Sequence, residues 1–281
     1  MILQKLYRLF GPKEVDVSSI YTSVAPAHTI IPNTVYQTWK HPRLPPYHAR
    51  GLRQFRRRNP DFSFRFFDDC EMASFMRQHF SEHPVLEVFE QLRVPAAKAD
   101  VWRYCVLYKE GGVYCDIDSA LSIPLHDILK DNPHELLSFE GNLWRDQLEV
   151  GNYADASSFL ETMPARVSKL LDHPDNTVLN WLLCFEKGHP LLEEAIAVIV
   201  RNFHFYRGKS FASMWKAVIH CTGPLALTQA AWRWMERTGR RPSQCGIDFH
   251  GKGIFKLPGS GYRDEVSPHF SSLNGQALTL E

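Results

Sequence analysis

A helix, a pair of glycines and a strand follow one another in the middle of the chain, and this segment constrains the fold more than any other. Pro95 can begin a helix because its missing N–H is not needed in the first turn, and Gly111 and Gly112 can end it. A strand is predicted over residues 113–118, because apolar and polar residues alternate there. A helix that returns the chain to a buried strand is typical of an α/β protein.

Strands and helices also alternate along the rest of the chain. The segments at 34–39 and 62–67 are rich in β-branched and aromatic residues, which favours buried strands. Further strands are predicted at residues 136–139 and 181–185. Helices are predicted up to Arg58 and over residues 71–80, 85–92, 96–110, 190–202 and 224–237. This order indicates a sheet covered by helices.

The charge balance gives no reason to expect a nucleic-acid partner. Lys and Arg number 32 against 31 Asp and Glu, so the net charge is +1 and no global field would attract a polyanion. The densest basic run, Arg53 with Arg56, Arg57 and Arg58, is interpreted as a solvated helix face, with contact to anionic lipid or acceptor as the alternative. With 44% hydrophobic residues, the 281-residue chain is expected to form one large folded domain.

No segment approaches the roughly 18 apolar residues of a membrane span, and no cleavable signal is convincing. We therefore expect a cytoplasmic protein. Leu3, Leu6, Tyr7 and Phe10 could form a small amphipathic helix on a membrane surface, or an ordinary docking helix. The six cysteines form no C-x-x-C pair and are expected to be reduced thiols.

Asp116 and Asp118 are the candidate metal ligands. They stand two residues apart on the predicted strand, so their side chains are expected on one face while Ile117 points into the core. Two carboxylates can hold a hard divalent cation, which readily shares its coordination with the oxygens of a diphosphate. Oxygen ligands suit Mn²⁺ or Mg²⁺ better than zinc. A D-x-D pair is common, so its surroundings decide its meaning.

Those surroundings resemble a known family. The segments KADVWRY at 98–104 and LYKEGGVYCDID at 107–118 are similar to the sugar-binding D-x-D region of glycosyltransferase family 32. That family includes the fungal initiating α-1,6-mannosyltransferase, inositol-phosphoceramide mannosyltransferases and globotriaosylceramide synthase, and the glucosylating domain of large clostridial toxins is similar more distantly. IPNTVYQTW at 31–39 resembles the family's opening strand, and FFDD at 66–69 its second. Looser matches follow at Asn180, Gly188 to Leu191 and Thr222 to Pro224.

The resemblance implies a GT-A-like, Rossmann-like α/β fold with a mixed, mostly parallel central sheet flanked by helices. It implies a single domain over 1–281, with an N-terminal helical extension at 1–29, a nucleotide-sugar-binding half at 30–140 and an acceptor-side half with a closing loop at 141–281. The implied activity is the transfer of a hexose from a UDP- or GDP-sugar to a glycan or glycolipid, with retention of configuration.

The resemblance also implies roles for the acidic residues and an arginine. Asp118 would ligate the metal directly, and Asp116 would reach the ribose and the metal. Asp100 and Arg103 match positions that contact the donor sugar. Their spacing of three places them on one helix face, so an ordinary intrahelical ion pair is the alternative.

The remaining implied contacts are spread along the chain. Thr38 and Trp39 match the position of the nucleotide base, and Asn180 matches a contact to the donor sugar; a core tryptophan and a turn-forming asparagine are the alternatives. His269 is the best match to a C-terminal histidine that helps to bind the metal or diphosphate, with His250 as its rival. The tryptophan that follows this histidine in the family is missing here.

Three other functions stay open at this point. The chain could be a toxin-like effector that glycosylates a protein side chain, or a non-catalytic sugar- or nucleotide-binding protein whose aspartates ligate calcium. A zinc enzyme would rest on His79 and His83, but Pro84 follows and no third ligand stands at a suitable spacing.

Overall fold

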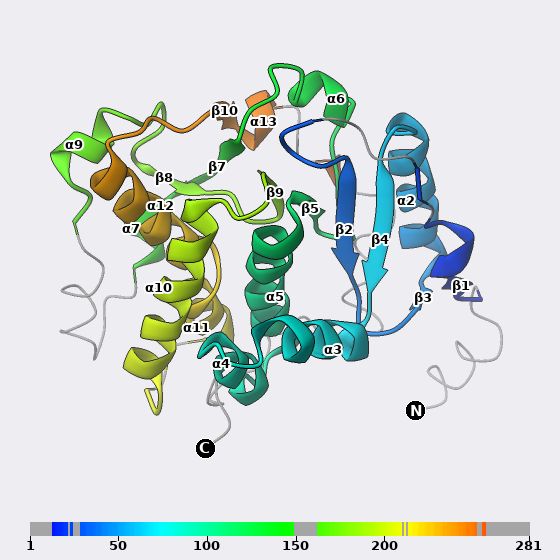
Figure 1. Ribbon diagram of the computed structural model, residues 1–281, viewed down its shortest axis with the longest axis horizontal. Coiled ribbons are helices and arrows are strands. Elements are labelled where there is room, and N and C mark those ends of the chain that lie inside the picture. The colour runs from blue at the N-terminus through cyan, green and yellow to red at the C-terminus, as the bar shows by residue number, and fades with distance from the viewer. Residues whose placement is uncertain are drawn as a thin grey trace.

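The structure is a computed structural model that describes residues 13–21, 23–24, 29–148, 162–209, 211, 213–251 and 255–256. At its centre lies a seven-stranded sheet (Figure 1). Its strands are β2 (Thr34–Thr38), β4 (Ser63–Phe67), β5 (Gly112–Cys115), β7 (Glu135–Leu143), β8 (Asn176–Val178), β9 (Leu182–Phe185) and β10 (Gln244–Ile247). The strand order is β10-β7-β9-β5-β2-β4, and β8 pairs with the later part of β7, beyond the residues that pair with β9.

Most strands of this sheet run in one direction. β2 is parallel to β4 and β5, and β7 is parallel to β10. β9 runs against β5 and β7, and β8 runs against β7. Two small sheets accompany it, one from β1 (Val15–Asp16) and β3 (Arg43–Leu44), the other from β6 (Ser119–Ala120) and β11 (Phe255–Lys256). The sheet is therefore mixed and mostly parallel, as predicted.

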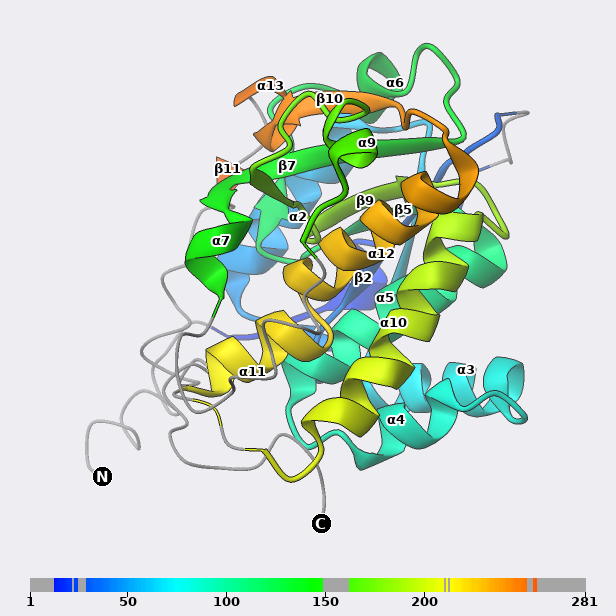
Figure 2. The ribbon, with the colours of Figure 1, turned by 90° about the vertical axis from the view of Figure 1, so that its left-hand side faces the viewer.

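Helices cover both faces of the sheet (Figures 1 and 2). Their bounds are α2 (Pro46–Arg58), α3 (Asp69–Phe80), α4 (Val85–Gln91), α5 (Pro95–Glu110), α6 (Leu125–Ile128), α7 (Trp144–Gln147), α9 (Ala165–Ser168), α10 (Pro190–Tyr206), α11 (Met214–Cys221), α12 (Pro224–Thr238) and α13 (Asp248–Gly251), with a 3₁₀ helix at Val17–Ser19. Alternation along the strands separates two cores. Val35 and Val113 pack with α2, whereas Tyr36 and Tyr114 pack with α3, α4, α5 and α10 to α12.

The start of α3 shows how local sequence sets an element boundary. The Asp68 carboxylate accepts a hydrogen bond from the N–H of Glu71, and the Glu71 carboxylate accepts one from the N–H of Asp68. This reciprocal capping satisfies donors that the first helical turn leaves without partners. Because β4 ends at Phe67, the cap turns the chain directly from strand to helix beside the end of β2.

The predicted strand over 113–118 is shorter in the structure. β5 ends at Cys115, the last residue paired with β9. The Asp116 N–H donates to the Trp181 carbonyl at 2.8 Å, and the Ser119 N–H donates to the Asp116 carbonyl at 3.0 Å, which closes a turn. The two aspartates therefore lie on this turn, and the strand alternation invoked to bring them together is wrong. The other predicted elements are present with shifted ends, while β8, β10 and α11 were not predicted.

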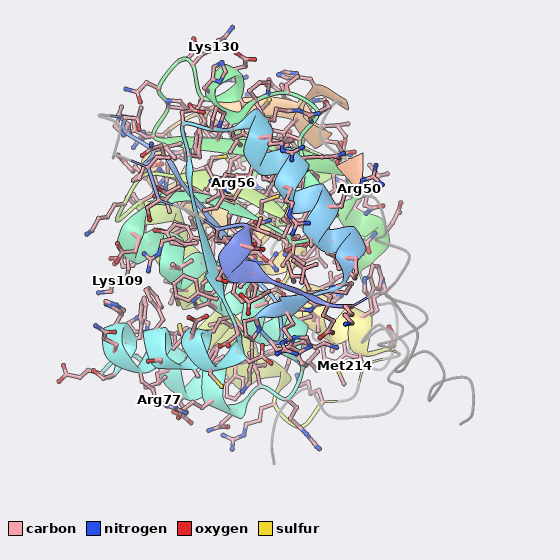
Figure 3. All side chains as sticks on the ribbon, turned by 90° about the vertical axis from the view of Figure 1, so that its right-hand side faces the viewer. Arg50, Arg56, Arg77, Lys109, Lys130 and Met214 are labelled. Carbon is pink, nitrogen blue, oxygen red and sulfur yellow. The ribbon has the colours of Figure 1, made fainter. Side chains whose placement is uncertain are left out.

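The basic run is on α2, which covers one side of the molecule (Figure 3). Arg57 is exposed, but Arg56 donates to the Ile20 carbonyl at 2.8 Å and Arg58 to the Leu121 carbonyl at 2.9 Å. Two of these arginines therefore fasten α2 to neighbouring loops. Among the described residues, no helix combines the length and the apolar character needed to cross a membrane.

The predicted boundary between the two halves of the chain is at residue 140. That boundary falls inside β7, and strands from both halves share the central sheet. The described part of 1–29 contains β1 and the short 3₁₀ helix. The amphipathic segment at Leu3 to Phe10 lies outside the described residues, and the assignment of 1–281 to a single domain stays a prediction.

Candidate active site

A cavity of about 690 Å³ opens where β2, β5 and β7 end. These strands run in the same direction, so their carboxyl ends meet at one edge of the sheet, where open α/β sheets bind ligands. One wall is the first half of α5, whose Ala96 and Ala99 leave room beside Asp100 and Arg103. The opposite walls come from β8, α11 and the start of α12.

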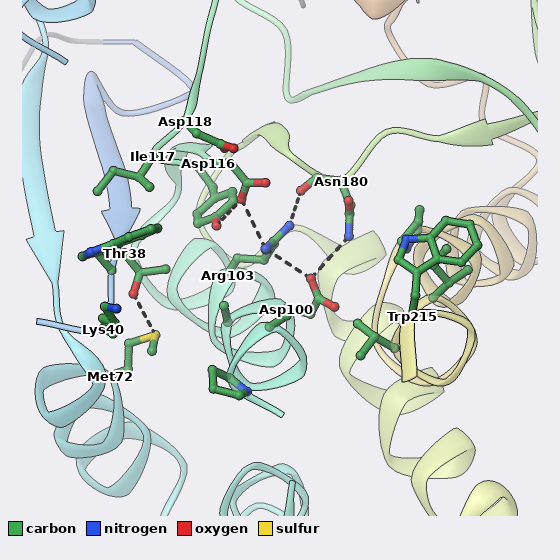
Figure 4. Close-up of a pocket in the computed structure, with 18 of the residues that line it drawn as sticks. Thr38, Lys40, Met72, Asp100, Arg103, Asp116, Ile117, Asp118, Asn180 and Trp215 are labelled. Carbon is green, nitrogen blue, oxygen red and sulfur yellow. Dashed lines mark hydrogen bonds and ion pairs between the residues drawn. The ribbon is translucent and has the colours of Figure 1, made fainter. Parts of the chain in front are cut away.

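Arg103 is the centre of the polar cluster in this cavity (Figure 4). One of its terminal nitrogens donates to the Asn180 carbonyl at 2.7 Å. The other lies 3.2 Å from Asp100 and 3.3 Å from Asp116, and the guanidinium carbon lies 4.3 Å from the centre of the Tyr114 ring. Contacts on several sides fix the guanidinium plane, a geometry for which arginine is better suited than lysine.

The expected intrahelical pair between Asp100 and Arg103 is therefore present, but it is part of a larger network. Asp100 is buried and also accepts a hydrogen bond from the Thr222 hydroxyl at 2.9 Å and a longer one from the Asn180 amide at 3.4 Å. Thr222 caps the end of α11, so this carboxylate ties α5 to α11. The cluster joins residues that are more than 100 positions apart in sequence.

Burial and pairing set the ionisation of the cluster. Burial raises the pKa of the Asp100 carboxyl to about 6, against the opposing effects of Arg103 and Thr222. Burial would lower the pKa of Arg103, but the surrounding Tyr114, Asp100 and Asp116 outweigh it and raise that pKa. Asp118 lines the same cavity, so three carboxylates accompany one guanidinium and leave an excess of two negative charges when all are ionised.

Asp116 and Asp118 both line the cavity, and a turn rather than a strand presents them. Their role as metal ligands stays a prediction. Asp116 accepts a hydrogen bond from the Tyr114 hydroxyl at 2.6 Å, and its side chain is 29% exposed. Asp118 is buried at 5% exposure. Within the described residues, no group of three or more His, Cys, Asp or Glu side chains could hold a metal. A cation here would take its remaining ligands from other oxygens, such as phosphate or water.

Thr38 and Trp39 lie on the β2 side of the cavity with Lys40. The Thr38 hydroxyl contacts the Met72 sulfur at 3.2 Å. Trp39 is partly exposed in the cavity and packs edge-on against His48, so it is not a fully buried core residue. The backbone N–H of Trp39 donates to the Phe67 carbonyl at 3.3 Å, so this backbone donor already has a partner.

Several cavity residues were not anticipated from the sequence: Lys40, Glu140, Asn142, Gln147, Thr177 and Trp215. Burial raises the pKa of Glu140 to about 7. The hydrogen bond from Asn142 lowers this pKa, whereas the nearby carboxylates of Asp248 and Asp116 raise it further. None of these residues belongs to a short motif, because they reach the cavity from separate segments: the end of β2, β7, α7, β8 and α11. Glu140 and Asn142, two polar residues near the end of β7, were the available signal, since polar residues at strand ends often reach a site.

The histidines considered from the sequence lie apart from this cluster or outside the described residues. His269 is outside the described residues. His250 is exposed on α13 and is not among the residues that line the cavity. His79 packs on the Phe75 ring, and the His83 side chain accepts the Val85 N–H at the start of α4. His79 and His83 therefore have structural contacts on α3 and α4.

Comparison with solved structures identifies the class of fold. The UDP-bound glycosyltransferase domain from the YGT toxin matches 88% of this chain and 84% of its own, with a TM-score of 0.50 and 10% sequence identity. At that identity the match speaks for the fold alone. The fold is that of GT-A glycosyltransferase domains, as predicted.

The sequence comparisons show which family this chain resembles. Residues 45–135 match the family described as "Glycosyltransferase sugar-binding region containing DXD motif". The resemblance inferred from the sequence, to the D-x-D region of these glycosyltransferases, is therefore confirmed.

Named relatives agree with this resemblance. The chain is similar to the initiation-specific alpha-1,6-mannosyltransferases of Schizosaccharomyces pombe and Candida albicans, at 27% and 24% identity over 75% of its length. It is also similar to inositol phosphoceramide mannosyltransferase 3 of Schizosaccharomyces pombe, at 26% identity over 72% of its length. The chain spans about half the length of these relatives, at 50%, 55% and 46%.

Proposed function

We propose that this chain is a metal-dependent glycosyltransferase that moves a hexose from a UDP- or GDP-sugar to a glycan or glycolipid acceptor, with retention of configuration. The observation that carries the proposal is the placement of Asp116, Asp118 and a buried Arg103 on one cavity at the carboxyl edge of the sheet. The names of the relatives specify mannosyl transfer, and one of them names inositol phosphoceramide, which supports a glycolipid acceptor.

The residues present fit a hard divalent cation. Asp116 and Asp118 supply carboxylate oxygens, and the excess of two negative charges in the cluster matches the charge of Mn²⁺ or Mg²⁺. We assign the metal to these two side chains, with His269 as a further candidate ligand. When bound, the cation would neutralise charge on the departing diphosphate.

Arg103 would act as a fixed positive charge beside the donor. Its contacts to Asn180, Asp100 and Asp116 hold the guanidinium in place before any ligand arrives, so little reorganisation is needed as charge develops. Asp100 would contact the donor sugar and also hold Arg103 and Thr222 in register. Asn180 would complete the contact to the sugar from the β8 to β9 connection.

Thr38 and Trp39 would bind the nucleotide base at the other end of the donor. The Trp39 ring is partly exposed in the cavity, which suits stacking on a planar base. The Trp39 indole N–H is buried and has no hydrogen-bond partner among the described residues, so a ligand acceptor atom would satisfy it. Peripheral membrane contact through the N-terminal segment stays a prediction.

The first test is Asp118→Asn, which removes a charge and keeps the shape of the side chain. We expect Mn²⁺-dependent hydrolysis of UDP-glucose, UDP-galactose or GDP-mannose to fall by about 100-fold or more, because the cation loses a ligand. Release of nucleotide is measured with and without Mn²⁺. Asp127→Asn is the matched control, because Asp127 is exposed and outside the cavity. Full activity of Asp118→Asn would refute the proposal.

The same protein distinguishes the non-catalytic alternative. Titration with UDP and GDP, with and without Mn²⁺, should show metal-dependent nucleotide binding. Affinity for free sugar with indifference to nucleotide would instead identify a carbohydrate-binding protein. Incubation with labelled donor and either lipid extract or cell lysate separates a glycolipid acceptor from a protein acceptor.

A further inference from the structure

The cavity continues past the Arg103 cluster, away from the proposed nucleotide end. Figure 4 places Thr38 and Lys40 on one side of Arg103 and Asp100, and Trp215 on the other. Asn180 lies between the cluster and Trp215 in this view. If the donor occupies the side near Thr38, the space beside Trp215 is left for a second substrate.

Four further polar residues line the same cavity, and we group them with Trp215 as the Trp215 end. The group consists of Glu140, Asn142, Gln147, Thr177 and Trp215. They come from the end of β7, from α7, from β8 and from α11. A carboxylate, two amides and a hydroxyl beside an indole ring form a mixed polar and aromatic surface.

Hydrogen bonds outside the cavity hold the walls of the Trp215 end together. The Asn176 amide donates to the Glu140 carbonyl at 2.9 Å and joins β8 to β7. Lys216 donates to the Gln147 carbonyl at 2.9 Å, and the His220 ring nitrogen lies 3.1 Å from the same oxygen. These contacts fix α11 relative to α7, so the ring and the polar groups are preorganised.

Two polar atoms of the Trp215 end are without partners in the described part of the chain. Thr177 is fully buried, lines the cavity, and its hydroxyl makes no hydrogen bond there. The Gln147 side-chain oxygen is also buried and unbonded. Buried polar groups are normally paired, and leaving one unpaired costs about 1–3 kcal/mol. A ligand rich in hydroxyl groups would satisfy both atoms.

We propose that the Trp215 end binds the acceptor as a pyranose ring, with the Trp215 indole against the apolar C–H face of the sugar and Glu140 accepting a hydrogen bond from one of its hydroxyls. The inference rests on the proposed function, since it names the second substrate of the same cavity. A pyranose matches the surface because it has one apolar face and a rim of hydroxyls.

Other acceptor chemistries fit the Trp215 end less well. An acyl chain would leave the Thr177 hydroxyl and the Gln147 side-chain oxygen without hydrogen bonds, at the cost of burying them unpaired. A protein serine or threonine offers a single hydroxyl to a surface with several polar groups. The acceptor moiety next to the donor is therefore a sugar, whether that sugar belongs to a free glycan or to a glycolipid headgroup.

The test measures nucleotide release from the best donor with and without methyl α-D-mannopyranoside, methyl β-D-galactopyranoside or methyl β-D-glucopyranoside. We expect one of these pyranosides to accelerate release by the wild-type protein. Trp215→Ala should raise the pyranoside concentration for half-maximal acceleration by about tenfold, and Trp215→Phe by about threefold because an aromatic ring remains. Glu140→Gln should also raise the pyranoside concentration for half-maximal acceleration.

The controls separate this inference from the proposed function. Hydrolysis without pyranoside and the affinity for UDP or GDP should stay within about twofold in Trp215→Ala and Trp215→Phe. Leu143→Ala removes an exposed apolar side chain on β7 that does not line the cavity, and it should behave as wild type. If wild type hydrolyses donor but no pyranoside accelerates it, or if a serine-containing peptide does so instead, the inference fails and the proposed function stands. If Trp215→Ala and Glu140→Gln weaken nucleotide binding as strongly as acceptor use, the Trp215 end belongs to the donor.

Discussion

Arg103 shows how a single buried side chain can organise a site. Its side chain is only 6% exposed and contacts Asp100, Asp116 and the Asn180 carbonyl. Removing a charge from water is costly, and the gain from pairing repays the cost only when hydrogen bonds are well placed. The fork of the guanidinium makes contacts in different directions at once, which an ammonium group on a flexible stem does not reproduce.

Replacing Arg103 by lysine tests this account at the residue scale. The charge is kept but the fork is lost, so we expect the free energy of unfolding to fall by about 1–3 kcal/mol and donor hydrolysis to fall by about 10- to 100-fold. Urea denaturation and nucleotide release measure the two effects. Arg77→Lys is the matched control, because Arg77 pairs with Glu90 on the surface, and it should change stability by less than about 0.5 kcal/mol. Equal behaviour of the two variants would contradict the positioning role of Arg103.

The junction of α5 and β5 is the element on which the site depends. α5 carries Asp100 and Arg103, and the turn after β5 carries Asp116 and Asp118. Gly112, between them, has a φ of +107°, and an added Cβ would lie 2.6 Å from the Thr34 carbonyl oxygen of the neighbouring strand. A side chain at this position would force β5 away from β2.

Gly112→Ala is therefore expected to destabilise the protein by about 3 kcal/mol or more, from backbone strain and steric overlap together. The unfolding midpoint in urea measures the change. Gly141→Ala makes the matched comparison, because Gly141 has no atom within 4 Å of the added methyl group and a φ outside the left-handed region. Its unfolding free energy should change by less than about 1 kcal/mol. A Gly112→Ala variant as stable as the wild type would show that β5 tolerates a side chain there.

At the scale of the whole molecule, the sheet order assembles the cavity. β2, β5 and β7 bring Thr38, Asp116 and Glu140 to one edge, while β8 and α11 add Thr177 and Trp215. No short segment contains the complete site, so the unfolded chain lacks it. A ligand of the cavity must therefore stabilise the native state.

Metal and nucleotide should raise the unfolding temperature together. At a nucleotide concentration of about 100 times Kd, the native state gains about 2.7 kcal/mol, which corresponds to a rise of several degrees for a chain of this size. A thermal-shift measurement with UDP or GDP, with Mn²⁺ and then with EDTA, checks this. We expect EDTA to remove most of the nucleotide-dependent rise, and Asp118→Asn to show little of it. A full nucleotide effect in EDTA would exclude a metal-bridged diphosphate.

The sequence by itself determined the local units of this protein. The helix from Pro95, the glycines that end it, the strand after them and the spacing of Asp100 with Arg103 follow from contacts between residues a few positions apart. The family motif also singled out two aspartates, and both of them line the cavity. The turn that presents them was not predicted, because it forms where pairing with β9 stops.

Only the tertiary structure decided which distant residues meet. Thr222 reaches Asp100 across 122 positions, and Asn180 reaches Arg103 across 77. Glu140 and Trp215 share the cavity because of strand order and helix packing, neither of which leaves a mark in a short window of sequence. Local periodicity reports which face of an element is buried, whereas the partner of that face depends on how the whole chain packs.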